Sequence, residues 1–175
     1  MGNDIVVVGG RTGTSGPSQP VTTTEIFNGT SWHDAAPIPV PVNHLAAASD
    51  GTYLYAVGGH QMTETSNTTA LQRFDPVTKQ WTKLPAMPAA ASGLAAVVVG
   101  DELITVGGDN ALSVFSTVRA YNLTTKKWST LPPLPQPLTG LGVAYYNNIL
   151  YAVDGASRPG HTASTNTLQI LRRPS

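Results

Sequence analysis

Histidines and carboxylates are the side chains of this chain that could carry out acid–base or metal chemistry. The four histidines, His33, His44, His60 and His161, fall in different predicted strands and loops and lack the short spacings of metal ligands. The chain contains no cysteine, which excludes a thiolate metal site, a disulfide and a cysteine nucleophile. We therefore expect neither a metal nor another cofactor.

The carboxylates are few, and most of them lie in predicted turns. Asp50, Asp75 and Asp101 stand next to Gly or Pro, where an Asp side chain commonly accepts hydrogen bonds from the backbone. The glycine-rich stretch 8–13 does not precede a predicted helix, so it lacks the helix N-terminus that phosphate-binding loops use. The sequence favours structural roles for these residues over catalysis or nucleotide binding.

Composition narrows the range of partners. Lys plus Arg equals Asp plus Glu at 10 each, and only 11% of the 175 residues are charged, so there is no basic field to attract nucleic acid or anionic lipid. The longest apolar runs, such as Leu94–Val99, are far shorter than the roughly 20 residues of a membrane helix. No signal peptide is visible at the N-terminus. We expect one soluble domain that neither binds nucleic acid nor inserts into membranes.

An internal repeat organises the chain. The pairs Gly9-Gly10, Gly58-Gly59 and Gly107-Gly108 are each 49 residues apart, and Asp154-Gly155 follows as a degenerate pair. The three tryptophans keep the same step, because each stands 26 residues before the first member of the next pair, namely Trp32, Trp81 and Trp128. A period of this length is typical of solenoids and propellers.

Each repeat unit is predicted to hold four short strands. The second unit predicts strands at 43–49, 53–57, 71–74 and 81–84, and the third at 94–99, 102–106, 118–121 and 127–131. The first unit lacks its innermost strand, and the last lacks its Trp strand. The predicted units are 1–37 (partial), 38–86, 87–133 and 134–175 (partial), which together make about three and a half blades.

One such sheet has two apolar faces that it cannot bury alone, so neighbouring sheets must stack around a common axis. We predict an all-β fold, an arc of four-stranded antiparallel blades. Glycine pairs suit places where a bulky side chain packs on bare backbone. We therefore expect Trp81 and Trp128 to be largely buried against the glycine pairs.

The pattern resembles the kelch repeat over essentially the whole chain. Its marks are an apolar strand ending in Gly-Gly, an aromatic residue 13 to 17 positions later, and a Trp 5 to 7 positions after that. The segment LQRFDPVTKQWTKLPAMP at 71–88 is close to the family pattern, and EIFNGTSW and RAYNLTTKKW are variants of it. The resemblance implies a kelch-type β-propeller.

The sequences of two further segments, HLAAASDGTYLYAVGG and RPGHTAST, resemble the C-terminal kelch region of actinobacterial sensor proteins. Some of these proteins join the kelch region to a serine/threonine kinase. No kinase motif lies in this chain, so the resemblance implies the sensor part, with an extracellular location.

The predicted binding face is one end of the propeller axis. In a meander, the loops between second and third strands share an end with the segments leading into the first strands. That end carries the longest loops, where we expect an unknown protein, peptide or carbohydrate ligand. The candidate ligand-binding residues there are Arg11, Asn43, His44, His60, Ser92, Asp109, Thr139, Arg158 and His161.

Three functions stay open. The first is a noncatalytic binding or scaffolding module. The second is a kelch-fold enzyme such as a sugar mutarotase, for which only His44 offers an axial acid or base, whereas a copper radical oxidase would need the missing cysteine. The third is a propeller fragment without independent function.

We expect the apolar faces at the two ends of the arc to be buried by another protein segment. An open arc would expose apolar residues of the first and last units, such as Ile5, Val7, Leu150 and Ala152. We therefore expect either a homodimer or a missing propeller segment to bury these two surfaces.

Overall fold

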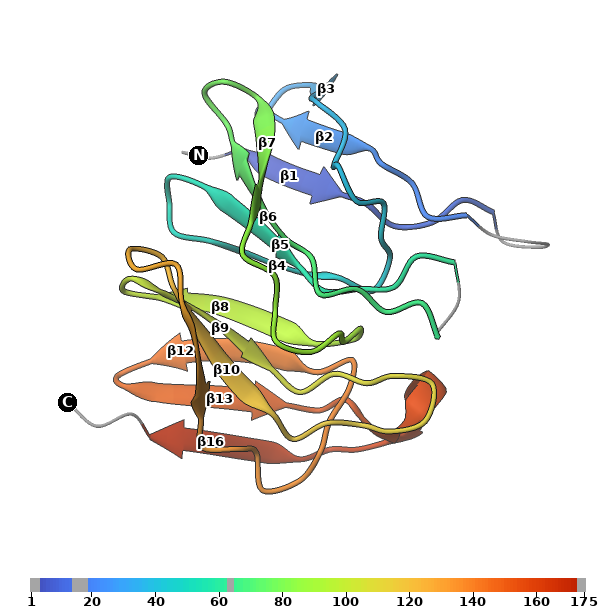
Figure 1. The fold of residues 1–175 in the computed structure, drawn as a ribbon, viewed down its shortest axis with the longest axis vertical. Helices are drawn as coiled ribbons and strands as arrows, with labels where there is room; N and C mark the ends of the chain where they lie inside the picture. Colours follow the sequence, from blue (N-terminus) through green and yellow to red (C-terminus); the bar gives the residue numbers. More distant parts are fainter. Residues whose placement is uncertain (1–3, 14–18, 63–64, 173–175) are drawn as a thin grey trace.

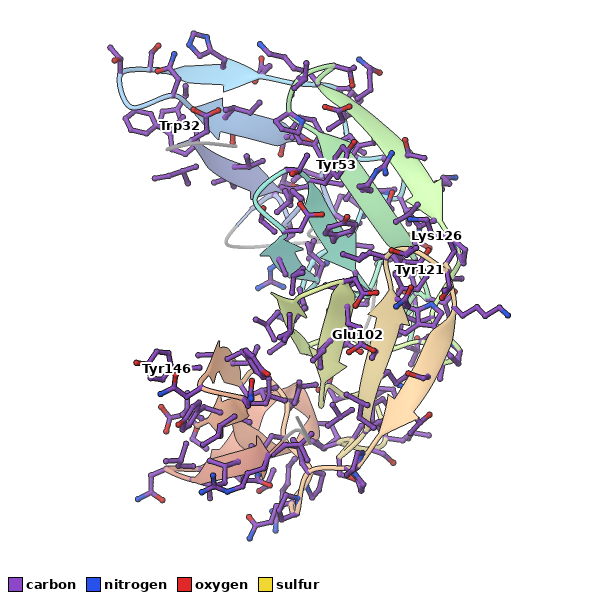
Figure 2. All side chains as sticks on the ribbon, turned by 90° about the vertical axis from the view of Figure 1, so that its left-hand side faces the viewer. Trp32, Tyr53, Glu102, Tyr121, Lys126 and Tyr146 are labelled. Carbon is purple, nitrogen blue, oxygen red and sulfur yellow. The ribbon has the colours of Figure 1, made fainter. Side chains whose placement is uncertain are left out.

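The structure, a computed structural model, describes residues 4–13, 19–62 and 65–172, apart from the side chains of His161 and Thr162. Among the described residues, short antiparallel strands form one two-stranded sheet and four sheets of three or four strands, here termed blades, which follow one another along the chain (Figure 1). Seen from the side, the blades form an arc that does not close into a ring (Figure 2). No helix among the described residues is both long and apolar enough to cross a membrane.

The blades hold three or four strands each. Blade 1 consists of β1 (Ile5–Val8), β2 (Thr24–Phe27) and β3 (Trp32–Asp34). Blade 2 consists of β4 (Ala46–Ser49), β5 (Leu54–Val57), β6 (Leu71–Asp75) and β7 (Gln80–Leu84). Blade 3 consists of β8 (Ala95–Val99), β9 (Glu102–Val106), β10 (Val118–Asn122) and β11 (Trp128–Leu131). Blade 4 consists of β12 (Gly142–Tyr146), β13 (Ile149–Val153) and β16 (Leu168–Arg172).

The predicted all-β arc of antiparallel blades is confirmed, with two local differences. The innermost strands β4 and β8 begin later than predicted, because His44 and Gly93 adopt positive φ just before them and interrupt the extended backbone. The segment between β13 and β16, expected to be one of the long loops, contains a small hairpin, in which β14 (Ala156–Arg158) and β15 (Thr162–Ser164) are joined by the 3-10 turn η1 (Pro159–His161).

Each blade has a front face toward the preceding blade and a rear face toward the following one. In blade 2, Leu54 and Phe74 on the front face pack with Ile26 of blade 1. On the rear face, Val57 and Leu71 pack in one cluster with Leu103 and Tyr121 of blade 3. The rear face of blade 3 packs on blade 4 in the same way, around Ile104, Val118, Leu150 and Ala152. The core is therefore a series of layers between blades.

Trp81 and Trp128 lie in these layers and not on the glycine pairs, so the prediction for them was wrong. Trp81 packs toward blade 1, and its indole N–H donates to the Ala36 carbonyl at 3.0 Å. Trp128 donates in the same way to Pro85 O of the connector from blade 2, at 3.2 Å. Both side chains are partly buried. They sit on outer strands, and their partners come from the preceding blade.

The glycine pairs instead contact the segment that leads into the next blade. We define the lead-in segments as 42–45, 91–94 and 138–141. A Cβ added at Gly9 or Gly58 would lie 2.6 Å from the carbonyl oxygen of Val42 or Ala91, which is far inside van der Waals contact. Only a residue without a side chain lets the next blade approach this closely.

The two end faces of the arc are apolar and exposed. Ile5 on the front face of blade 1 is 56% exposed, whereas Leu54 at the same position of blade 2 is 6% exposed. Leu150 and Ala152 are buried against blade 3, so their predicted exposure was wrong. Successive residues of a strand point to opposite faces of the sheet. The rear face of blade 4 is therefore formed by the neighbours of the buried residues and by their cross-strand partners. These exposed residues are Tyr146, Val153, Leu168 and Ile170.

A buried glutamine ties each of two blades to the connector before it. Gln72 of β6 is 1% exposed; its Oε1 accepts from Val40 N at 2.8 Å, and its Nε2 donates to Val40 O at 3.4 Å. Gln169 of β16 makes the same two bonds with Gln136. These two connectors are thus held by a glutamine side chain from the third strand of the following blade.

We expect Gln72→Leu to lower the free energy of unfolding by about 2 kcal/mol, because both backbone groups of Val40 lose their buried partners. Urea unfolding followed by circular dichroism measures the change. Gln80→Leu on the exposed strand β7 is the control and should change stability by less than about 0.5 kcal/mol. Equal effects of the two substitutions would contradict this role of Gln72.

Candidate functional site

The lead-in segments and the loops between second and third strands meet at one end of the axis. Asn43 forms a backbone bridge with His60, and His60 forms another with Asn67. In blade 3, Ser92 bridges Asp109, which bridges Val114. In blade 4, Thr139 bridges Ala156. Blades 2 and 3 therefore place the residue after the glycine pair between a lead-in segment and a loop, and in blade 4 this residue, Ala156, bridges the lead-in residue Thr139.

Backbone hydrogen bonds join the blades around this end. The N–H of Gly93 donates to His44 O at 2.9 Å, and the N–H of Gly140 donates to Gly93 O at 2.7 Å. All three residues have positive φ, between 52° and 62°. Positive φ costs glycine little, but it is strained for a residue with a side chain. His44 is thus the one member of this series that carries a side chain.

His44 stacks on His60. Their ring centroids are 4.8 Å apart and the rings are 16° from parallel. Asn43 Nδ2 donates to Gln61 O at 3.4 Å, which leaves Asn43 Oδ1 to accept from His44 Nδ1. His60 is buried and His44 is exposed. A strained residue that positions an exposed imidazole is the kind of backbone feature found at binding sites.

The neighbouring blade adds a buried polar pair. Ser92 Oγ donates to Asp109 Oδ1 at 2.9 Å, and both residues are buried. Asn67 of blade 2 reaches across and donates from Nδ2 to Asp109 O at 2.7 Å. Thr139 of blade 4 is fully buried, and its hydroxyl donates to Gly93 O at 3.4 Å. Polar side chains of three blades therefore form one connected surface.

Six of the predicted site residues belong to this surface, which we name the axial surface: Asn43, His44, His60, Ser92, Asp109 and Thr139. Arg11 is exposed on blade 1, where it bridges Pro20 and joins none of the six. Arg158 is exposed at the end of β14 in the blade 4 hairpin. The side chain of His161 lies outside the described part of the structure.

The sequence reasoning missed two features of this end. Asn67 was not among the candidate site residues, although it links blade 2 to blade 3. Asp154 stands where the other blades have the first glycine of the pair, and its φ of 55° matches theirs. The repeat register marked Asp154 as part of a degenerate pair but gave no reason to add it to the candidate site residues.

The carboxylates in turns lie at the opposite end of the axis, where they accept hydrogen bonds from backbone N–H groups. Asp50 accepts from Thr52 N at 2.8 Å, Tyr53 N at 2.6 Å and the Tyr55 hydroxyl at 2.8 Å. Burial alone would raise the pKa of Asp50, but the bonds from Tyr53, Tyr55 and Thr52 bring it below its ordinary value. Hydrogen bonds from Val77 N and Thr78 N lower the pKa of Asp75 as well. No group of three or more potential metal ligands occurs among the described residues.

Relatives share the repeat over part of their length. The chain is 32% identical over 116 residues to Kelch-like protein terF of Aspergillus terreus. This alignment covers 62% of this chain and 25% of that protein. It is 26% identical over 117 residues to human Kelch-like protein 34, or 61% of this chain and 18% of the relative. It is 29% identical over 96 residues to the F-box/kelch-repeat protein At1g16250 of Arabidopsis thaliana, or 50% and 25%. The chain therefore spans a quarter or less of each of these relatives.

The fold has a counterpart among solved structures. The structure of YjhT superposes with a TM-score of 0.78 at 18% sequence identity, over 94% of this chain and 63% of that chain. At this identity the likeness shows the fold alone. Residues 1–155 match the KLHDC2/KLHL20/DRC7 Kelch-repeats domain family. The glycine pairs, the tryptophan spacing, the stacked blades and this match together show that the chain belongs to the kelch-repeat family.

Proposed function

We propose that this kelch-repeat domain is a noncatalytic binding module whose axial surface contacts a protein, peptide or carbohydrate ligand. The observation that carries the proposal is the exposed imidazole of His44, held at positive φ and stacked on His60. Neither a turn nor a close approach of backbone explains a histidine there, because the equivalent residues are Gly93 and Gly140. The strain is consistent with a side chain retained for contact with a ligand.

The surroundings favour a polar ligand without strong net charge. Of the six residues of the axial surface only His44 is exposed; the amide, hydroxyl and carboxylate groups around it, including Asp109, which accepts from Ser92, are buried. The exposed group is therefore a hydrogen-bonding imidazole, which suits hydroxyl-rich sugars or peptide backbone. The resemblance to sensor kelch regions supports a sensor role with the domain outside the cell, which is part of the same proposal.

Replacement of His44 by glycine tests the proposal. A displayed library of linear peptides and a panel of neutral oligosaccharides serve as probes, and binding is measured by calorimetry. We expect His44→Gly to lower the affinity for any selected ligand at least tenfold. The domain should stay folded, because glycine adopts this φ without strain.

Asn148→Gly is the matched control. Asn148 also has positive φ, at 59°, but lies in the β12–β13 turn at the opposite end of the axis. Its replacement should leave affinity unchanged. Equal losses in both variants, or chemical-shift changes confined to the turns around Asp50 and Gly100, would contradict the proposal. Catalysed interconversion of sugar anomers that His44→Gly abolishes would instead support a mutarotase.

A further inference from the structure

A pocket of about 420 Å³ lies at the axial end of blade 4. We name it the junction pocket, and its lining residues are Thr139, Gly140, Asp154, Gly155, Ala156, Ser164 and Thr165. Blade 4 forms one end of the arc, where Tyr146 is exposed (Figure 2). The equivalent places in blades 1, 2 and 3 are filled by the lead-in segment of the following blade. Those three junctions show what kind of segment fits.

The filled junctions share a pattern of backbone hydrogen bonds. At all three, the second glycine of the pair donates its N–H to a lead-in carbonyl: Gly10 to Val42 at 3.0 Å, Gly59 to Ala91 at 2.9 Å and Gly108 to Leu138 at 2.8 Å. At the second and third junctions, the N–H two residues further along the lead-in segment donates back, from Gly93 to His44 O and from Gly140 to Gly93 O. The ligand at these two junctions is thus a peptide segment with a carbonyl at position i and an N–H at position i+2.

The junction pocket offers the same two groups. Gly155 holds the place of Gly108, and its N–H has no hydrogen-bond partner among the described residues. The carbonyl of Gly140 holds the place of Gly93 O and likewise accepts from none of them. Blade 4 therefore presents both the donor and the acceptor that bind a lead-in segment elsewhere in the arc.

Asp154 makes the fourth junction different. At Gly9, Gly58 and Gly107, the missing Cβ leaves room for the lead-in carbonyl and for the side chain of a leucine at position i+3. These leucines are Leu45, Leu94 and Leu141, whose Cδ2 atoms would lie 3.0, 2.7 and 3.2 Å from such a Cβ. Asp154 places a Cβ and a carboxylate at this point. The carboxylate repels a carbonyl and gains nothing from an apolar side chain.

We propose that the junction pocket binds an extended peptide segment that carries Lys or Arg at position i+3, where the other lead-in segments carry leucine. The carbonyl at i accepts from Gly155, the N–H at i+2 donates to Gly140, and the cation pairs with Asp154. The ion pair offsets the wider spacing that the Asp154 Cβ imposes on the carbonyl. Asp154 is the only charged residue among the described residues that line the pocket, so a single positive charge on the segment complements it.

This site goes beyond the binding proposed for the axial surface and can be tested apart from it. The probe is a ten-residue peptide with the sequence of residues 134–143, LPQPLTGLGV, and its Leu141→Lys version. Binding to the 175-residue chain is measured by NMR titration at low salt. We expect the Lys peptide to bind at least tenfold more tightly and to shift the amide of Gly155. The preference should shrink at high salt, as expected for an ion pair near the surface.

Asp154→Gly should remove or reverse this preference, because it restores the glycine of the other three junctions and their room for leucine. The fold should tolerate the change, since glycine at this position already has φ of 64° to 67° in three blades. Asp101→Gly, in the β8–β9 turn at the opposite end, is the control and should keep the preference. Failure of both peptides to bind the unaltered chain, or a Lys preference that persists in Asp154→Gly, would overturn the proposal.

Discussion

Gly107→Ala is expected to lower the free energy of unfolding by about 4 kcal/mol. Gly107 has φ of 64°, which costs an L-residue about 1 kcal/mol or more. The added Cβ would also overlap the carbonyl oxygen of Leu138, a backbone atom held by Gly108. Blades 3 and 4 must then separate at the axis, with loss of that hydrogen bond and of close packing. The midpoint of thermal unfolding should fall by about 10 °C or more.

Gly100→Ala separates the two causes. Gly100 has φ of 58°, close to that of Gly107, but nothing lies within 4 Å of the position its Cβ would take. This variant should therefore lose only about 1 kcal/mol, the cost of the backbone conformation. Thermal and urea unfolding followed by circular dichroism give both values. Similar losses in the two variants would show that close approach of the blades is not what the glycine pair provides.

Trp81→Ala is expected to cost about 3 kcal/mol. The indole packs with Ile26, Leu54 and Phe74 between blades 1 and 2, with its ring centroid 5.1 Å from that of Phe74. Its N–H donates to Ala36 O and to Thr24 Oγ1, at 3.0 and 3.1 Å. Truncation leaves a cavity in the layer and removes the donor of two hydrogen bonds. Urea unfolding is measured by circular dichroism, because this signal does not depend on the tryptophan fluorescence that the substitution removes.

Trp32→Ala provides the comparison within the same chain. Trp32 holds the same position in blade 1 and contacts Phe27, with ring centroids 5.2 Å apart, but its side chain is 52% exposed at the end of the arc (Figure 2). Its truncation should cost less than about 1 kcal/mol in this chain. A large loss at Trp32, or a small one at Trp81, would mean that packing on the preceding blade does not set the contribution of these tryptophans.

The repeat allowed the strands to be predicted because each depends on local features. The apolar strand before a glycine pair, the aromatic residue of the third strand and the Trp of the fourth recur with nearly constant spacing, so β5, β6 and β7 fall where the pattern places them. The six clustered site residues could also be placed at one end of the axis, because a meander alternates its loops. What they form there depends on contacts between blades, such as the stacking of His44 on His60.

The sequence by itself determined the number of units, their strands and the end of the axis on which the long loops lie, because short-range periodicity and turn chemistry encode these. Only the tertiary structure decided which face each apolar residue occupies, so Leu150 is buried and Ile170 exposed although both lie in paired strands of blade 4. It also showed that the glycine pairs leave room for the backbone of the following blade, whereas Trp81 packs on the preceding blade. Asp154 gained its meaning in the same way. The repeat register shows that Asp154 replaces a glycine, but its importance comes from residues of the next blade that fill the equivalent places elsewhere, and only the fold brings these distant segments together.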